Sequence, residues 1–119
     1  MKTQMITTTT AEKLKRATFN LRFDAYWMRN GAEAAVQCSL CEKHTPEKRK
    51  SYARQARKEF KQASDLYAQA AATCQAWLDV DNEKGVRWWY RFLPAAFNAR
   101  AQACNASAKE VLADAKLIK

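Results

Sequence analysis

Residues Thr45 to Trp77, TPEKRKSYARQARKEFKQASDLYAQAAATCQAW, decide the fold of this 119-residue chain. Thr45-Pro46-Glu47 combines a capping hydroxyl, a proline suited to the first helical position and an acidic residue in the first turn, which together predict a helix start. Small and large apolar residues then follow at alternating steps of four and three: Ala56, Phe60, Ala63, Tyr67, Ala70, Cys74 and Trp77. This heptad seam predicts a long helix, ending near Asp79, that packs closely against antiparallel neighbours.

A first helical segment precedes this one. Thr10 is placed to cap its start, and an apolar stripe then recurs at steps of three and four toward His44: Leu14, Ala17, Leu21, Ala25, Met28, Ala32 and Ala35. The stripe keeps its phase across Gly31, which predicts a weakened or kinked helix. Alternatively, Asn30-Gly31 is a C-cap and turn that splits the segment and gives four helices. Residues 1–10 are polar and Thr-rich, so we expect a flexible arm there.

A third segment runs from about Asn82 to the C-terminus. Pro94 lacks a backbone donor, so we expect the segment to kink there or to form a short helix followed by a longer one. Its apolar stripe comprises Val86, Tyr90, Leu93, Phe97, Ala101, Cys104, Ala108, Val111, Ala115 and Ile118.

The composition supports an all-α fold. The chain has 23 Ala, only six Val and Ile together, and two each of Gly and Pro, which argues against a sheet with its β-branched strands and tight turns. We therefore predict an elongated antiparallel helical bundle of three long segments, forming one domain over residues 11–119.

The charge of the chain points to anionic partners. Twenty-one Lys and Arg against twelve Asp and Glu leave a net charge of +9, which attracts polyanions, nucleic acid first among them. The N-terminus lacks the apolar core of a signal peptide, and no run approaches the ~18 apolar residues of a membrane span. We expect a cytoplasmic protein with four reduced cysteines and no membrane association; secretion with two disulfides is the alternative.

The positive charge gathers on the predicted second helix. Five cations fall within about a quarter turn of the helical wheel, nearly opposite the apolar seam: Lys50, Arg54, Arg57, Lys58 and Lys61. Lys48 and Arg49 extend this group toward the helix start. Cations in the N-terminal half of a helix are mildly unfavourable, so the arrangement suggests a use beyond stability. The alternative is an ordinary solvated outer face.

Two aromatic groups stand out. In Arg87-Trp88-Trp89-Tyr90-Arg91-Phe92 the rings cannot all face one core, so Trp88 is expected at the surface, where Arg87, Trp88 and Arg91 would stack on bases or anchor a protein interface. The alternative is that these rings close the end of the bundle beside Pro94. In the first segment, Phe19, Phe23 and Tyr26 form a stripe away from Leu21, which predicts a homodimer contact or a partner surface.

The sequence offers little for catalysis or metal binding. The local candidates for a metal site are Cys38, Cys41 and His44. Tetrahedral zinc needs four ligands, however, and His44 falls on a different side of the predicted helix from the two cysteines. We therefore interpret the cysteines as small apolar residues and predict no metal and no cofactor. One histidine, no Gly-rich phosphate loop and no paired carboxylates on an apolar face indicate that the chain is not an enzyme.

Two hypotheses follow from these patterns. The first is a non-catalytic helical module whose basic second helix engages a polyanion, either nucleic acid or a nucleoprotein complex. The alternative is a protein-binding adaptor or steric inhibitor, of the kind that phages and plasmids encode against host complexes, acting through the aromatic face of the first segment.

Overall fold

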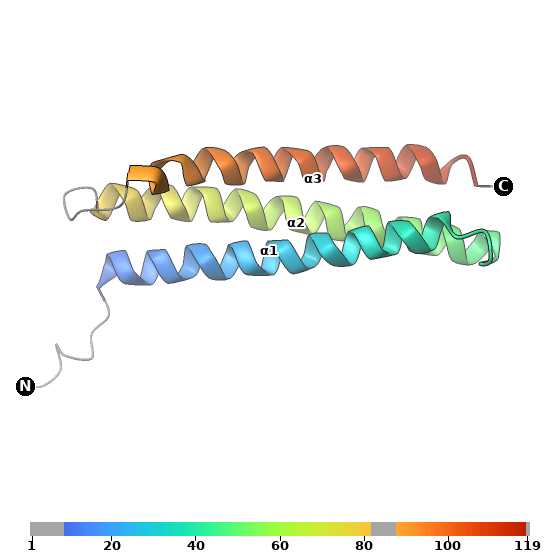
Figure 1. Ribbon diagram of the computed structural model, residues 1–119, viewed down its shortest axis with the longest axis horizontal. Coiled ribbons are helices and arrows are strands. Elements are labelled where there is room, and N and C mark those ends of the chain that lie inside the picture. The colour runs from blue at the N-terminus through green and yellow to red at the C-terminus, as the bar shows by residue number, and fades with distance from the viewer. Residues whose placement is uncertain (1–8, 82–87, 119) are drawn as a thin grey trace, which may run out of the picture.

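The computed structural model describes residues 9–81 and 88–118, which form three long antiparallel helices (Figure 1). Helix α1 spans Thr10–Leu40 and α2 spans Pro46–Asp81, while a 3-10 helix, η2 (Trp88–Phe92), leads into α3 (Leu93–Ala115). No strand occurs within this described part. At 1.5 Å per residue, the 36 residues of α2 extend about 54 Å, so the bundle is elongated as the periodicity predicts.

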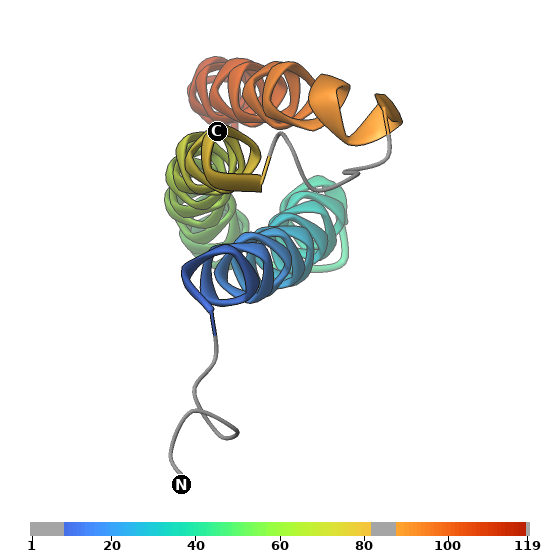
Figure 2. The same ribbon diagram turned by 90° about the vertical axis from the view of Figure 1, so that its left-hand side faces the viewer.

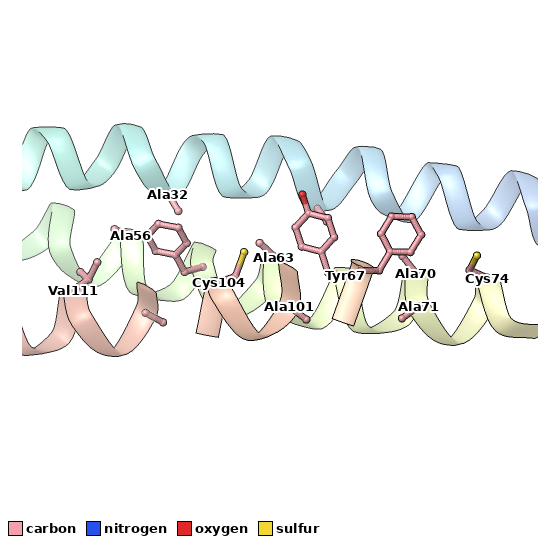
Figure 3. Packing of buried hydrophobic residues seen from close by; sticks show 14 of the residues in the cluster. Ala32, Ala56, Ala63, Tyr67, Ala70, Ala71, Cys74, Ala101, Cys104 and Val111 are labelled. Atoms are coloured by element: carbon pink, nitrogen blue, oxygen red, sulfur yellow. The ribbon is translucent and has the colours of Figure 1, made fainter. Parts of the chain in front are cut away.

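Helix α2 supplies the centre of the core. All seven residues of its predicted seam are buried, and they meet buried residues of both other helices. In Figure 3, Tyr67 projects from α2 toward α1. Ala56 of α2 belongs to the same packed cluster as Cys104 and Val111 of α3. Alanines between the large side chains let the helix axes approach closely, which explains how so alanine-rich a chain fills its core.

The helix starts follow local capping chemistry. Thr9, rather than the predicted Thr10, caps α1: its side-chain oxygen accepts a hydrogen bond from the Glu12 N–H at 3.1 Å. Glu12 lies three residues after Thr9, so the pair has the spacing of a capping box, and this spacing selects Thr9 among consecutive threonines. The predicted start of α2 is confirmed, because the Lys48 N–H donates to the Thr45 hydroxyl oxygen at 3.3 Å.

Helix α1 continues without interruption through Gly31, so the alternative of four helices is wrong. The helix ends at Leu40 and does not reach His44. A Cβ at position 31 would lie 2.9 Å from the Glu59 Oε2 atom. Because glycine has no side chain, this carboxylate of α2 can lie directly beside α1. Gly31 therefore marks a close approach between two helices and not a turn.

We expect the change Gly31→Ala to stabilise the protein by about 0.5–1 kcal/mol, because alanine is the better residue in a helix interior. The carboxylate it displaces is the end of a flexible side chain, and its buried Oε2 makes no hydrogen bond within the described residues. Urea unfolding followed by circular dichroism measures the change. The reverse substitution at an exposed site of the same helix, Ala34→Gly, should cost about 1 kcal/mol. A loss of stability in Gly31→Ala would show that the Glu59 carboxylate is fixed where it lies.

Pro94 lies in the first turn of α3 and does not kink a continuous helix. Proline fits there because the N–H groups in the first turn of a helix have no carbonyl acceptor within that helix, so the N–H that proline lacks is not missed. The predicted third segment is therefore a short 3-10 turn followed by a longer helix. The start of that segment and most of the predicted arm, residues 82–87 and 1–8, lie outside the described residues.

The three helices do not close into a triangle. Helix α2 packs along both α1 and α3, whereas α1 and α3 make few contacts with each other. The end-on view in Figure 2 shows α1 and α3 flanking α2. At the end where η2 lies, Phe19 of α1, Trp77 of α2 and Tyr90 of η2 meet in edge-on and tilted ring contacts, with centroids 5.1–6.5 Å apart.

Candidate functional site

The five cations predicted on α2 lie on one open face of that helix. We call this the basic face; Lys50, Arg54, Lys58 and Lys61 are exposed in it and Arg57 is half-buried. Lys50 and Lys61 are eleven residues apart, so the face is about 16 Å long. No ion pair or side-chain hydrogen bond joins any of the five to another group in the described part of the chain.

The positive charge is confined to the first half of α2. Farther along the helix, the same sector of the wheel holds Ala68, Ala72 and Asp79, which are exposed and neutral or acidic. The Ser64 hydroxyl donates to the Ala101 carbonyl oxygen at 2.8 Å, which fixes the register of α3 against α2. By this register, the exposed Lys109 of α3 and Lys116, which follows that helix, lie beside the same half of α2. The exposed Glu110 and Asp114 lie in the same part of α3, so this helix adds no net charge to that half of the molecule.

The acidic residue in the middle of this stretch of α2, Glu59, is turned away from the basic face. Glu59 is half-buried, its Oε2 atom faces Gly31 of α1, and its Oε1 atom accepts a hydrogen bond from Gln55 at 3.0 Å. The carboxylate is thereby held on the opposite flank of the helix from Lys61. Glu47 and Asp65 are exposed in the same sector of the helical wheel, one at each end of the basic face, but neither forms an ion pair with the five cations within the described residues.

The flanking cations have different positions. Lys48 is exposed beside the basic face, whereas the Arg49 Nε atom donates to the Ser39 carbonyl oxygen at 2.8 Å and the side chain is half-buried. Arg49 therefore ties the start of α2 to the end of α1, and its assignment as a binding residue stays a prediction. The free carbonyls at the end of a helix attract such a cation, a tertiary role that helical spacing does not reveal.

The Arg-aromatic segment is separate from the basic face. Arg91 is exposed on η2, at the end of the bundle where α2 terminates, while Lys50 lies near the other end of α2. Arg87 and the side chain of Trp88 lie outside the described residues. The fold therefore does not bring Arg91 next to the five cations.

The aromatic stripe of α1 divides into a buried part and an exposed part. Phe19 was expected at a partner surface, but it packs against the buried Trp77 at 6.1 Å and the half-buried Tyr90 at 6.5 Å, so this expectation was wrong. Phe23 and Tyr26 are exposed, and Trp27 joins them, with ring centroids 6.0 and 5.7 Å from theirs. We call Phe23, Tyr26 and Trp27 the aromatic patch. Helical spacing would have placed Trp27 in this patch, because residues four positions apart, such as Phe23 and Trp27, are neighbours on a helix surface.

The four cysteines fall into two classes of burial. Cys38 and Cys41 are half-buried near the end of α1, and the His44 ring stacks at a tilt on Tyr52, with centroids 5.2 Å apart. No three metal-ligating side chains come together among the residues that the structure describes. Cys74 and Cys104 are buried free thiols of the core; burial raises the pKa of Cys74 to about 11 and also raises the pKa of Cys104.

We expect two classes of thiol reactivity. At pH 9, where an ordinary thiol is about half ionised, Cys74 is about 1% thiolate because its pKa lies near 11, and its burial excludes the reagent. Labelling with iodoacetamide, followed by mass spectrometry, should modify Cys38 and Cys41 first and reach Cys74 and Cys104 only as the protein unfolds. Equal rates at all four cysteines would contradict the packing of the core.

No helix within the described residues is long and apolar enough to cross a membrane. No protein-family model, curated protein sequence or solved structure matches this chain.

Proposed function

We propose that this protein is a non-catalytic cytoplasmic module that binds nucleic acid, alone or within a nucleoprotein complex, through the basic face of α2. The observation that carries the proposal is the group of five cations on one rigid helical face, none of which forms an ion pair within the described residues. Lys50, Arg54, Lys58 and Lys61 would contact phosphates, with Arg57 beside them. Phosphate contacts set position and not sequence preference, so binding is expected to be independent of sequence.

The dimensions of the face suit a phosphate backbone. B-DNA carries one negative charge per ~1.7 Å of helix axis, both strands counted, so five cations on a face about 16 Å long meet a dense array of phosphates. Neutralising these phosphates releases condensed counterions, which supplies the affinity. Without such a ligand, the five cations repel one another and oppose the dipole of their own helix, at a cost of tenths of a kcal/mol each.

The test is the affinity of the full chain for a fluorescein-labelled mixed-sequence DNA duplex and for a mixed-sequence RNA. Four or five phosphate contacts predict a slope of about −4 for log affinity against log salt, which is a loss of roughly 250-fold between 50 and 200 mM. Fluorescence anisotropy measures both quantities. Absence of binding at 50 mM salt, or an affinity that does not depend on salt, would end the proposal.

A second candidate function is supported by the aromatic patch. Phe23, Tyr26 and Trp27 are 60%, 46% and 57% exposed, and at 150–250 Å² per ring they offer on the order of 300 Å² of apolar surface. This is the size of functional patches on monomers, and it is small beside the ~800 Å² per partner of a stable interface. The patch would therefore serve as the apolar anchor of a larger interface, with a partner protein or with a second copy of the chain.

For this candidate, Phe23→Asp should remove a bound partner while leaving the helical content unchanged. Leu112→Asp, on an exposed leucine of α3, is the matched control. Sedimentation velocity distinguishes a partner surface from self-association. If the parent protein at 100 μM sediments as a monomer, with the same sedimentation coefficient as Phe23→Asp, the homodimer is excluded.

A further inference from the structure

Ser51 lies at the edge of the basic face, near the start of α2. Its side chain is exposed, and its hydroxyl makes no hydrogen bond within the described part of the chain. Two of its neighbours on the helix surface are cations: Lys48 lies three residues before it and Arg54 three residues after it. Ser51 is therefore an unengaged hydroxyl beside the surface that is proposed to bind phosphates.

The sequence before Ser51 is strongly basic. Lys48, Arg49 and Lys50 directly precede it, and no other serine or threonine in the chain follows three consecutive cations. Protein kinases select their substrates in part by such charge patterns. A run of cations before the target hydroxyl suits kinases whose substrate groove is acidic. Ser51 thus differs from every other hydroxyl of this chain in its sequence context.

The start of α2 can open without disturbing the core. A kinase takes its substrate in an extended conformation, so residues 46–52 have to leave the helix before Ser51 can react. None of the side chains in this stretch is buried. Opening it costs the cap that Thr45 provides and the hydrogen bond of Arg49 to the end of α1, together with backbone hydrogen bonds of the first turns. Local openings of this kind cost less free energy than global unfolding.

We propose that Ser51 is a phosphorylation site that switches off nucleic-acid binding at the basic face, an inference that rests on the proposed function. A serine kinase would transfer the γ-phosphoryl group of ATP to the Ser51 Oγ atom. The new O–P bond replaces the bond to the departing ADP, and the hydroxyl proton passes to a base of the kinase. The product carries about 1.5–2 additional negative charges at pH 7.

The added phosphate would compete with nucleic acid for the same cations. Lys48 and Arg54 are within its reach, and the guanidinium of Arg54 can donate two hydrogen bonds to it. Glu47 is exposed four residues before Ser51 and would repel the phosphate, which favours the contact with Arg54. Two cations would then be engaged within the chain, and the phosphate would repel the nucleic-acid backbone. Basic clusters elsewhere are released from anionic surfaces by phosphorylation in this way.

The first measurement asks whether the hydroxyl is modified. The full chain is incubated with ATP and the catalytic subunit of cyclic-AMP-dependent protein kinase, which prefers basic residues before its target serine. Mass spectrometry maps the phosphate, which we expect on Ser51. Incorporation should disappear in Ser51→Ala and remain in the matched control Ser107→Ala, which alters a half-buried serine of α3. Absence of phosphate on Ser51, or equal modification of other hydroxyls, would overturn the proposal.

The second measurement asks what the phosphate does. The phosphorylated chain should bind the mixed-sequence DNA duplex about tenfold more weakly than the unmodified chain at 100 mM salt, with a salt slope about 1.8 units less steep if two phosphate contacts are lost. Ser51→Asp should reproduce part of this loss. Asn20→Asp adds the same charge at an exposed position of α1 and should lose little affinity. Circular dichroism confirms that each form retains its helical content.

The outcomes separate this inference from the function on which it rests. Unchanged affinity after phosphorylation would overturn the switch and leave the proposed function intact, because the unmodified chain still binds. Equal losses in Ser51→Asp and Asn20→Asp would also overturn it, because net charge and not the position of the phosphate would then be responsible. Failure of the unmodified chain to bind DNA would end both.

Discussion

Replacing Trp77 by alanine is expected to destabilise the protein by about 3–5 kcal/mol, the usual cost of removing a large aromatic side chain from a core. Trp77 is 2% exposed and joins three elements, because its ring contacts Phe19 of α1 and Tyr90 of η2 while belonging to α2 itself. Its Nε1–H donates to Asp81 Oδ2 at 3.3 Å, and the ammonium of Lys15 lies 5.7 Å from the ring centroid.

The loss should be a large fraction of the total stability, which is about 5–15 kcal/mol for a domain. Urea unfolding followed at 222 nm gives the free energy directly. Trp27→Ala is the matched control, since the same side chain is 57% exposed on α1 and its removal should cost less than about 1 kcal/mol. Similar losses in the two variants would contradict the packing of α1 against the end of α2.

The second large effect concerns binding. Changing Arg54, Lys58 and Lys61 together to glutamine should make the salt slope about 2.7 units less steep, because each lost phosphate contact accounts for about 0.9 unit. Affinity for duplex DNA at 100 mM salt should fall by one to two orders of magnitude or more. All three residues are exposed, so helical content and the unfolding midpoint should remain close to those of the parent protein.

A matched control separates local contacts from net charge. The variant Lys13→Gln, Arg16→Gln and Arg22→Gln removes the same three charges from exposed positions on α1. If the basic face is the site, this control should keep a slope near that of the parent protein and lose little affinity. Equal losses in both triple variants would mean that overall charge, and no particular face, attracts the nucleic acid.

The bundle could be predicted because local rules and packing agree along most of the chain. The seam from Ala56 to Trp77 is buried throughout, and Thr45-Pro46-Glu47 marks the start of α2 where it was expected. Gly31 was ambiguous because a glycine after asparagine fits both a C-cap and a helix interior. Only the carboxylate of Glu59 on the facing helix, which is not local information, shows why glycine occupies that position.

The site could be predicted only in part. The wheel correctly placed the five cations opposite the buried seam, since both depend on one helix and its period. The helical wheel wrongly placed Phe19 at a partner surface. In the structure, η2 and the end of α2 cover a side of α1 that a simple three-helix arrangement would leave open. The wheel also did not reveal the structural contact of Arg49, because the acceptor is a backbone carbonyl on another helix. Neither contact leaves a periodic signal in the sequence.

The most direct test of the central claim is a lysine acetylation footprint, with and without a saturating mixed-sequence DNA duplex at 50 mM salt. Bound phosphates should protect Lys50, Lys58 and Lys61 by at least fivefold in the rate of modification, whereas Lys13 on α1 should react at an unchanged rate. Uniform protection of all lysines, or protection centred on α1, would contradict binding through the basic face of α2.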